Sequence, residues 1–263
     1  MRWLATALAA LAGLGFVAVA AGQPSSGIVH PGKQPGQSQL DFGSALYSAN
    51  CLSCHGIAGA GIESPRPGQG AGGISGSGPS LQGVGAQAPD FYLRTGRMPI
   101  GHAGEAPERG RRDFNEGEIR ALVAYVAGLG NGPPIPDPHP RGASLSKGMQ
   151  LFTEHCAGCH QIVGEGGYVT NARVPVLQHA TPTQIAEAVR IGPYLMPRFS
   201  PKAISDLELD AIVAYVQHSK HPEDRGGLGI GHIGPVPEGI VAWLVAAIVL
   251  VGVCALIGER VRT

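Results

Sequence analysis

The sequence predicts an all-α protein: two copies of one small helical domain in tandem, preceded by an apolar N-terminal segment and followed by a transmembrane helix. Two copies are predicted because the same cysteine motif begins at residue 51 and again at residue 156, with similar sequence on both sides. Helices are predicted because apolar residues recur at intervals of three and four near the end of each copy. The transmembrane helix is predicted because residues 240–257 contain no charge.

Composition limits what these domains can bind and how they fill their cores. The chain has 263 residues with 19 basic and 19 acidic side chains, which argues against a nucleic-acid-binding protein. Only 5% of the residues are aromatic, while 41 are glycine and 22 are proline. We therefore expect short helices joined by irregular segments, and cores in which something other than side chains supplies part of the volume.

Each cysteine motif has the form of a c-type haem attachment sequence, Cys-x-x-Cys-His. Its two thiols can form thioethers with the vinyl groups of one haem, and its imidazole then lies beneath the iron as the proximal ligand. The motifs are Cys51-Leu52-Ser53-Cys54-His55 and Cys156-Ala157-Gly158-Cys159-His160. One zinc site shared by both cysteine pairs is an alternative, but it would leave the histidines unused. The sequence thus predicts two covalently bound haem c groups.

The segments around the motifs repeat in the same order. Before each motif a glycine and an aromatic residue four positions apart share one helix face, so a second helix can cross closely at the glycine. The last helix of each copy carries an apolar stripe that we expect in the core. These features are Gly43 and Tyr47, Gly148 and Phe152, and the stripes Ile119, Leu122, Val123, Val126 and Leu209, Ile212, Val213, Val216.

A methionine followed by proline lies downstream of each motif and is the predicted sixth iron ligand. The two are Met98 and Met196. A thioether is a soft ligand that raises the iron's potential, and the proline holds the backbone extended beside it. Met149, on the first helix of the second copy, is instead expected to fill core space. Histidines are the alternative distal ligands, the nearest being His102, His155 and His179.

With these elements in place, residues 40–130 and 145–220 each resemble a class I cytochrome c domain. The resemblance implies an N-terminal helix crossing a C-terminal one, with the haem between them and a distal methionine from a loop. It also implies that the carbonyls of Pro79 and Pro175 accept the N–H of the proximal imidazoles. Three arginines are candidates to pair with haem propionates, although solvent-exposed arginines are commoner: Arg94, Arg97 and Arg190.

Two apolar segments predict the relation to a membrane. Residues 240–257 would form a helix about 27 Å long, close to the thickness of the hydrocarbon layer. The positive-inside rule places the following arginines in the cytoplasm. The uncharged segment from Trp3 to Gly22 is either a cleaved signal peptide or a retained anchor. In both cases residues 23–239 would lie outside the cytoplasm.

The predicted organisation follows from these segments and from three linkers rich in glycine and proline. The middle linker should be a stiff extended spacer, and the glycine-rich stretch between residues 56 and 78 a mobile loop or a docking surface. The parts are a signal peptide or signal anchor (1–22), a linker (23–40), cytochrome c domain 1 (41–130), a proline-rich linker (131–146), cytochrome c domain 2 (147–220), a Gly/Pro linker (221–239), the transmembrane helix (240–257) and a cytoplasmic tail (258–263).

Further segments extend the resemblance over residues 40 to about 258. They are Gly78-Pro79-Ser80-Leu81, Thr95-Gly96-Arg97-Met98-Pro99, Met196-Pro197-Arg198-Phe199-Ser200, the run 226–235, Glu238-Gly239 and Trp243. Together with the haem motifs they resemble the dihaem cytochrome c (cytochrome cc) subunit of the actinobacterial-type menaquinol–cytochrome c reductase, the cytochrome bc complex.

This resemblance implies a membrane-anchored electron-transfer subunit of a quinol–cytochrome c reductase, an oxidoreductase and translocase, with no separate substrate site. Its partners would be a cytochrome b subunit, a Rieske iron–sulfur subunit and a terminal cytochrome c oxidase. The Rieske centre would reduce the haem held by Cys51, Cys54, His55 and Met98, and the haem held by Cys156, Cys159, His160 and Met196 would pass electrons towards the oxidase. The alternative is a stand-alone membrane-tethered dihaem carrier or oxidase subunit. A haem-based sensor would need a signalling domain, and the sequence offers none.

Overall fold

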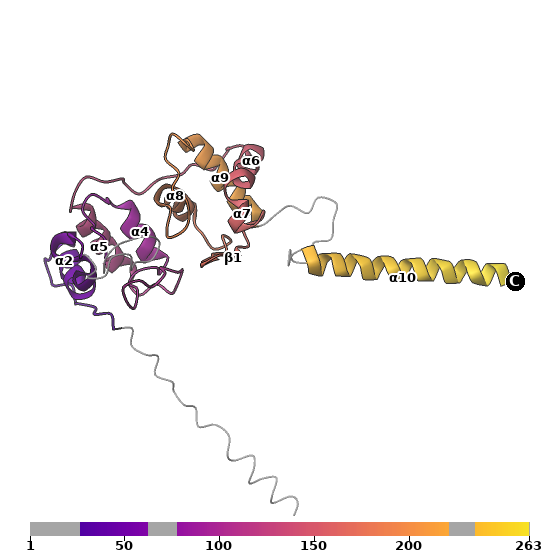
Figure 1. The fold of residues 1–263 in the computed structure, drawn as a ribbon, viewed down its shortest axis with the longest axis horizontal. Coiled ribbons are helices and arrows are strands. Elements are labelled where there is room, and N and C mark those ends of the chain that lie inside the picture. Colours follow the sequence, from indigo (N-terminus) through magenta and orange to yellow (C-terminus); the bar gives the residue numbers. More distant parts are fainter. Residues whose placement is uncertain (1–26, 63–77, 221–234, 263) are drawn as a thin grey trace, which may run out of the picture. The chain divides into compact units, whose positions relative to one another are not determined.

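The structure, a computed structural model, describes residues 27–62, 78–220 and 235–262 (Figure 1). Two compact units divide between Gln217 and His218, and each is described on its own. The predicted N-terminal segment 1–22, most of the glycine-rich stretch after the first motif, and residues 221–234 lie outside the described residues.

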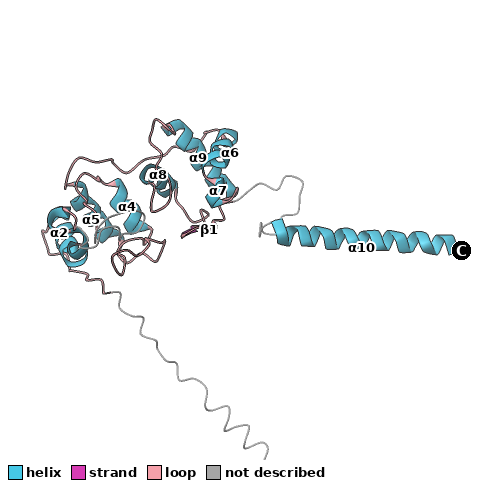
Figure 2. Ribbon diagram, viewed as in Figure 1, coloured by secondary structure: helices cyan, strands magenta, loops and turns pink. Residues whose placement is uncertain are grey.

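The first unit is built from short helices, which confirms the predicted all-α class (Figure 2). In the first copy these are α2 (Gln39–Asn50), α3 (Leu52–His55), the 3-10 turn η1 (Ile57–Gly59), α4 (Gln87–Arg94) and α5 (Glu116–Ala127). In the second copy they are α6 (Leu145–His155), α7 (Ala157–His160), α8 (Pro182–Ile191) and α9 (Asp206–Ser219). A short antiparallel hairpin, β1 (Gly167–Val169) with β2 (Ala172–Val174), accompanies them.

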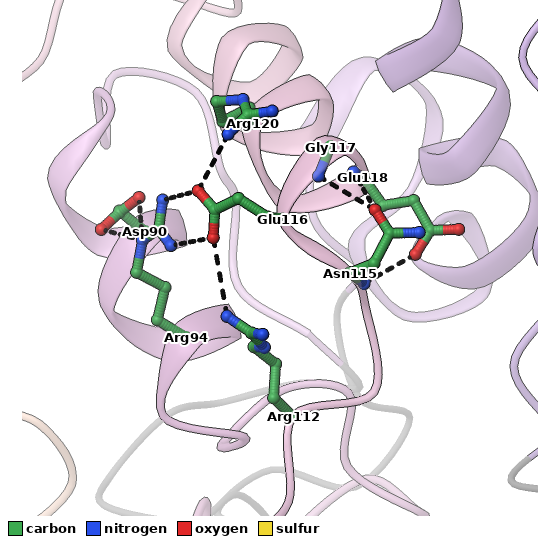
Figure 3. Close-up of polar contacts among 8 residues, drawn as sticks. All are labelled: Asp90, Arg94, Arg112, Asn115, Glu116, Gly117, Glu118 and Arg120. Carbon is green, nitrogen blue, oxygen red and sulfur yellow. Dashed lines mark hydrogen bonds and ion pairs between the residues drawn. The ribbon is translucent and has the colours of Figure 1, made fainter.

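Polar side chains fix where two of these helices begin. Asn115 accepts from the backbone N–H of Glu118, whose carboxylate in turn accepts from the Asn115 N–H, a capping box that starts α5 (Figure 3). Thr181 and Gln184 form the same reciprocal pair at the start of α8. These caps satisfy N–H groups that would otherwise lack partners, so the helix starts are encoded locally.

In each copy the first helix crosses the last at a glycine, as predicted. A Cβ atom added to Gly43 would overlap the carbonyl oxygen of Ala121 in α5, and one added to Gly148 would overlap that of Ala211 in α9. The backbones of the crossing helices are therefore in direct contact. Residues 27–38, in the predicted N-terminal linker, also join the first copy, where Val29 N–H donates to Asn50 Oδ1 over 2.8 Å.

Each crossing belongs to its own hydrophobic core, which includes the predicted apolar stripes. The Tyr47 and Tyr125 rings lie 5.0 Å apart in the first core, and the Phe152 and Tyr215 rings lie 5.4 Å apart in the second. The expectation that Met149 fills the core is wrong, because half of its surface (50%) is exposed on the outer face of α6.

The two copies also contact each other, through α4 and α8. The proline-rich linker between them is hydrogen-bonded to both copies rather than acting only as a spacer. The Pro133 carbonyl accepts from the N–H groups of Ala86 (3.1 Å) and Gln87 (3.3 Å) at the start of α4. The His139 N–H donates to Asp210 Oδ1 in α9 over 2.7 Å.

The α4–α8 contact buries a pair of carboxyl groups, which the sequence reading missed. Glu187 of α8 has no exposed surface (0%) and Asp90 of α4 has 3%. As a carboxylate, Glu187 would lack a donor on both oxygens within the described part of the chain, whereas as a carboxylic acid it can donate to Asp90. Burial, and then the charge of Asp90, raise the pKa of Glu187 to about 9, while Arg94 opposes this shift.

This pair predicts that stability falls as pH rises through the neutral range. Glu187 would lose its proton near 4.5 in the unfolded chain but only near 9 in the folded one. The folded state therefore binds the extra proton in that window, and its stability should drop by up to about 1.4 kcal/mol per pH unit. Thermal unfolding of the haem-loaded protein in detergent, followed by circular dichroism at about pH 6 and about pH 8.5, measures this slope.

The Glu187→Gln variant should lose this pH dependence and be the more stable protein at the higher pH, because the amide donates to Asp90 without a titrating proton. Glu165→Gln, at an exposed position on the loop before β1, is the matched control and should keep the wild-type slope. A Glu187→Gln protein with the wild-type slope would contradict the prediction.

The second unit contains α10 (Pro235–Arg262). Its stretch Gly239–Arg260 is long and apolar enough to cross a membrane: an 18-residue window within it has a mean hydropathy of 3.0, and none of that window is buried. The predicted transmembrane segment 240–257 falls within this helix.

Candidate haem sites

Both cysteine motifs fold as one tight helical turn directly after the first helix of their copy. The Cys51 N–H donates to the Tyr47 carbonyl (2.8 Å), which continues the path of α2, and the His55 N–H donates to the Cys51 carbonyl (2.9 Å). The second motif repeats this pattern, with Cys156 N–H on the Phe152 carbonyl at 2.8 Å. The spacing of two residues between the cysteines thus becomes a single turn, α3 or α7, that ends at the histidine.

The histidine that ends each motif contacts the proline carbonyl predicted for it. His55 Nδ1 lies 2.8 Å from the Pro79 oxygen, and His160 Nδ1 lies 3.3 Å from the Pro175 oxygen. Donation to these carbonyls puts the ring proton on Nδ1 and leaves the Nε2 lone pair for a metal. Burial lowers the pKa of His160, which favours the neutral imidazole that ligation requires.

The thiols lie in surroundings of low polarity. Burial, and then the neighbouring Cys54, raise the pKa of Cys51 to about 12, and the corresponding effects raise the pKa of Cys156 to about 11. Cys54 is half-buried and Cys159 exposed. In the second motif one thiol is therefore directed into the domain and the other lies nearer the surface, as expected for a flat apolar group held at its edge, whereas both thiols of the first motif are half-buried.

The loops that carry the two methionines are tightly held. Gly192 ends α8 in the left-handed conformation (φ 65°), and a Cβ atom there would lie 2.6 Å from the Arg198 nitrogen. Met196 is half-buried against the core of the second copy, and Met98 is half-buried against that of the first. The structure thus brings each predicted distal methionine to the same core as its motif.

A cavity of about 410 Å³ joins these groups in the second copy. Its lining includes the second motif's attachment and ligand residues, Cys156, Cys159, His160 and Met196, together with mainly apolar side chains such as Leu177, Ile185 and Val189. Two thiols, an imidazole and a thioether around one apolar cavity are the donor set that haem c needs, so the residues present fit this cofactor.

The three arginines considered for the propionates differ in their environment. Arg94 binds both oxygens of Glu116 (2.6 and 2.9 Å) and those of Asp90 (2.8 Å), as Figure 3 shows. Arg190 donates to Asp206 and to two backbone carbonyls of the loop after Met196. Only Arg97 of the three has no carboxylate partner among the described residues.

Arg97, one of the three candidates for a propionate partner, is buried with an exposed fraction of only 8%, in contrast to the solvent-exposed position that is commoner for an arginine. Burial, and then the charge of Arg109, lower its pKa to about 10, so it stays charged at neutral pH. Its place in the cavity of the other copy could not be read from the sequence, because that contact depends on how α4 packs against α8.

Two of the three alternative histidine ligands lie at the second site. His102 is exposed and lies 3.3 Å from Glu105, whereas His155 and His179 line the cavity of the second copy from exposed positions. Within residues 27–62, 78–220 and 235–262, no three His, Cys, Asp or Glu side chains converge as a metal cluster, so the described cysteine pairs do not form the shared zinc site.

Comparison with known proteins agrees with two cytochrome c domains in this chain. The family model described as cytochrome C oxidase, cbb3-type, subunit III matches residues 38–126 and 143–216. A cytochrome bc1 complex cytochrome c subunit of Corynebacterium diphtheriae is 32% identical over 94% of this chain and 93% of its own. The protein of that name from Mycobacterium tuberculosis is 36% identical over 84% and 78%, respectively. A cbb3-type cytochrome c oxidase subunit CcoP of Helicobacter pylori is 27% identical over 73% and 63%. Since the family model matches both halves and a relative that is 32% identical covers 94% of the chain, the chain belongs to the family of cytochrome bc1 complex cytochrome c subunits.

Proposed function

We propose that this chain is the dihaem electron-transfer subunit of a respiratory quinol–cytochrome c reductase, relaying electrons from a Rieske iron–sulfur subunit towards a terminal cytochrome c oxidase. The observation that carries the proposal is the duplication itself. Two haem attachment turns lie in one chain, and their copies contact each other through α4 and α8. Two haem sites in contacting domains suit electron transfer from one haem to the other along a fixed path. The oxidation of quinol would take place in other subunits of the complex.

Each residue of the two sites has a role in this proposal. Cys51 and Cys54, and likewise Cys156 and Cys159, hold one haem c each through thioethers. His55 with Met98, and His160 with Met196, are the axial ligands. Haem c supplies a one-electron redox couple at its iron. The chain's own groups fix the imidazoles through Pro79 and Pro175 and exclude water with the surrounding apolar side chains.

The apolar helix α10 supports a location at the cell membrane. The apolar stretch Gly239–Arg260 anchors the chain in the cell membrane, with the haem domains on the extracytoplasmic side and the C-terminus in the cytoplasm. Attachment on one membrane surface keeps the haem domains beside cytochrome b and the Rieske subunit without a need for free diffusion.

A stand-alone tethered carrier or an oxidase subunit is the second candidate, since the matching family model and the Helicobacter pylori relative are both named for cbb3-type oxidases. A reduced-minus-oxidised spectrum separates a quinol reductase from a stand-alone carrier, and quinol-dependent reduction of the c-type haems in the same preparation separates it from a cbb3-type oxidase, which also carries b-type haem. The protein should be purified through a tag from native membranes in mild detergent. We expect b-type bands to accompany two c-type haems per chain. A spectrum with c-type haem alone would overturn the assignment to a quinol reductase.

A further inference from the structure

The cavity at the second haem motif is completed by side chains of the first copy. Besides the second copy's own residues, its lining includes Phe91, Thr95, Arg97, Glu108 and Arg109, all of which precede α5 in the chain. The second site therefore does not lie within one domain, although its attachment motif and both candidate axial ligands do.

Arg97 is the buried cation on this wall. Its guanidinium carbon lies 5.0 Å from the centroid of the Phe91 ring, whose face partly offsets the loss of water. No carboxylate forms an ion pair with it in the part of the chain that the structure describes, in contrast to Arg94 and Arg190. A buried cation that forms no ion pair is costly even with a carboxylate elsewhere in the cavity wall, so this position is suited to an anionic ligand group.

The other charged side chains of the lining are mostly basic. Arg109 lines it beside Arg97, and its terminal nitrogen donates to the His179 carbonyl of the second copy over 3.4 Å. Arg173 of β2 lines it from the second copy, and Glu108 is the acidic side chain in the lining. Three arginines against one carboxylate leave this wall positive, while the lining around Ile185 and Val189 is apolar.

We propose that Arg97 of the first copy supplies the counter-charge for a propionate of the haem bound by the second copy. The inference rests on the proposed haem ligation, because haem is an apolar plate that carries two carboxylates on one edge. The plate matches the apolar lining and the carboxylates match the arginine wall. Since Arg97 adjoins Met98, the same loop serves the first haem as a ligand and the second as an electrostatic partner.

The test is an equilibrium redox titration of the full chain, purified in detergent with its haems and followed by absorbance. Arg97→Gln should make the second haem harder to reduce, because an uncompensated propionate stabilises the oxidised iron. We expect the ratio of reduced to oxidised second haem to fall about tenfold at a fixed ambient potential, which is about 59 mV for one electron. Arg97→Lys keeps the charge and should show less than half of that shift.

Two further sets of variants make the result specific. Met98→His and Met196→His should each move one redox wave strongly, which assigns the waves to the sites. Lys202→Gln removes an exposed cation between α8 and α9, in the same connection as Met196, and should leave both waves in place, because water and salt screen it.

Three results would overturn the proposal. In the first, Arg97→Gln leaves the second wave unmoved; in the second, it moves the first wave instead, as a disturbance of Met98 would; in the third, Arg97→Lys matches Arg97→Gln. If neither methionine variant moved any wave, the proposed ligation itself would fail, an outcome separate from these three.

Discussion

Replacing Met196 with alanine should lower the reduction potential of the second haem by on the order of 0.1 V and abolish its thioether-to-iron absorption band. The reason is that a thioether favours reduced iron more than water or a second imidazole does, and axial ligands set haem potentials over a range of about 0.8 V. Met196 lies half-buried at the second cavity, on the loop between Gly192 and Phe199. A redox titration with parallel absorption spectra measures both effects.

The chain contains its own matched control for this change. Met149→Ala removes the same side chain from the same copy, but from a half-exposed position on α6. It should leave the potential and the absorption band at their wild-type values. A Met196→Ala protein with the wild-type potential and band would mean that another group ligates the second iron. His155 and His179, which line that cavity, would then be the first candidates.

The features that sequence alone could predict are those encoded within one copy. The apolar stripes fix the core faces of α5 and α9, and the glycine four positions before an aromatic residue fixes the helix crossing. Each of these features occurs in both copies, so the prediction for one copy could be compared with that for the other. The proline contacts to His55 and His160 followed from the resemblance and are present in both copies.

The features that could not be predicted arise where the copies meet. Glu187 is an acidic residue within the amphipathic helix α8, and nothing in its own helix shows that Asp90 of α4 will cover it. Arg97 likewise precedes the first methionine but lines the second cavity. The periodicity of apolar residues within a helix indicates which of its faces is buried, but not which distant element covers that face. The contacts of Glu187 and Arg97 therefore could not be predicted from the sequence. The β1–β2 hairpin was not predicted for a different reason, because strands of three residues are too short to show an alternating hydrophobic pattern.

The Gly148→Ala variant should lose about 2 kcal/mol or more of stability, which corresponds to roughly 4–8 °C in the melting temperature. Two effects of opposite sign compete. Alanine favours the helix by about 1 kcal/mol over glycine. However, its Cβ atom would overlap the Ala211 carbonyl oxygen and lie 2.9 Å from the Tyr215 Cβ, so α6 and α9 must move apart. Moving one backbone away from the other loosens the packing along the whole helix crossing. The free-energy cost of this change should therefore exceed the gain from the higher helix propensity of alanine.

Gly158→Ala isolates the favourable effect, because the space around a Cβ atom at that position is open within the described structure. The first motif already carries a side chain there, Ser53, so the position tolerates one. We expect its melting temperature, followed by circular dichroism on the haem-loaded protein, to equal or slightly exceed that of the wild type. If Gly148→Ala matched Gly158→Ala, the close approach of α6 to α9 would not limit stability. The cavity that these helices help to line would then have to tolerate a wider crossing, and the glycine at each crossing would have no packing role.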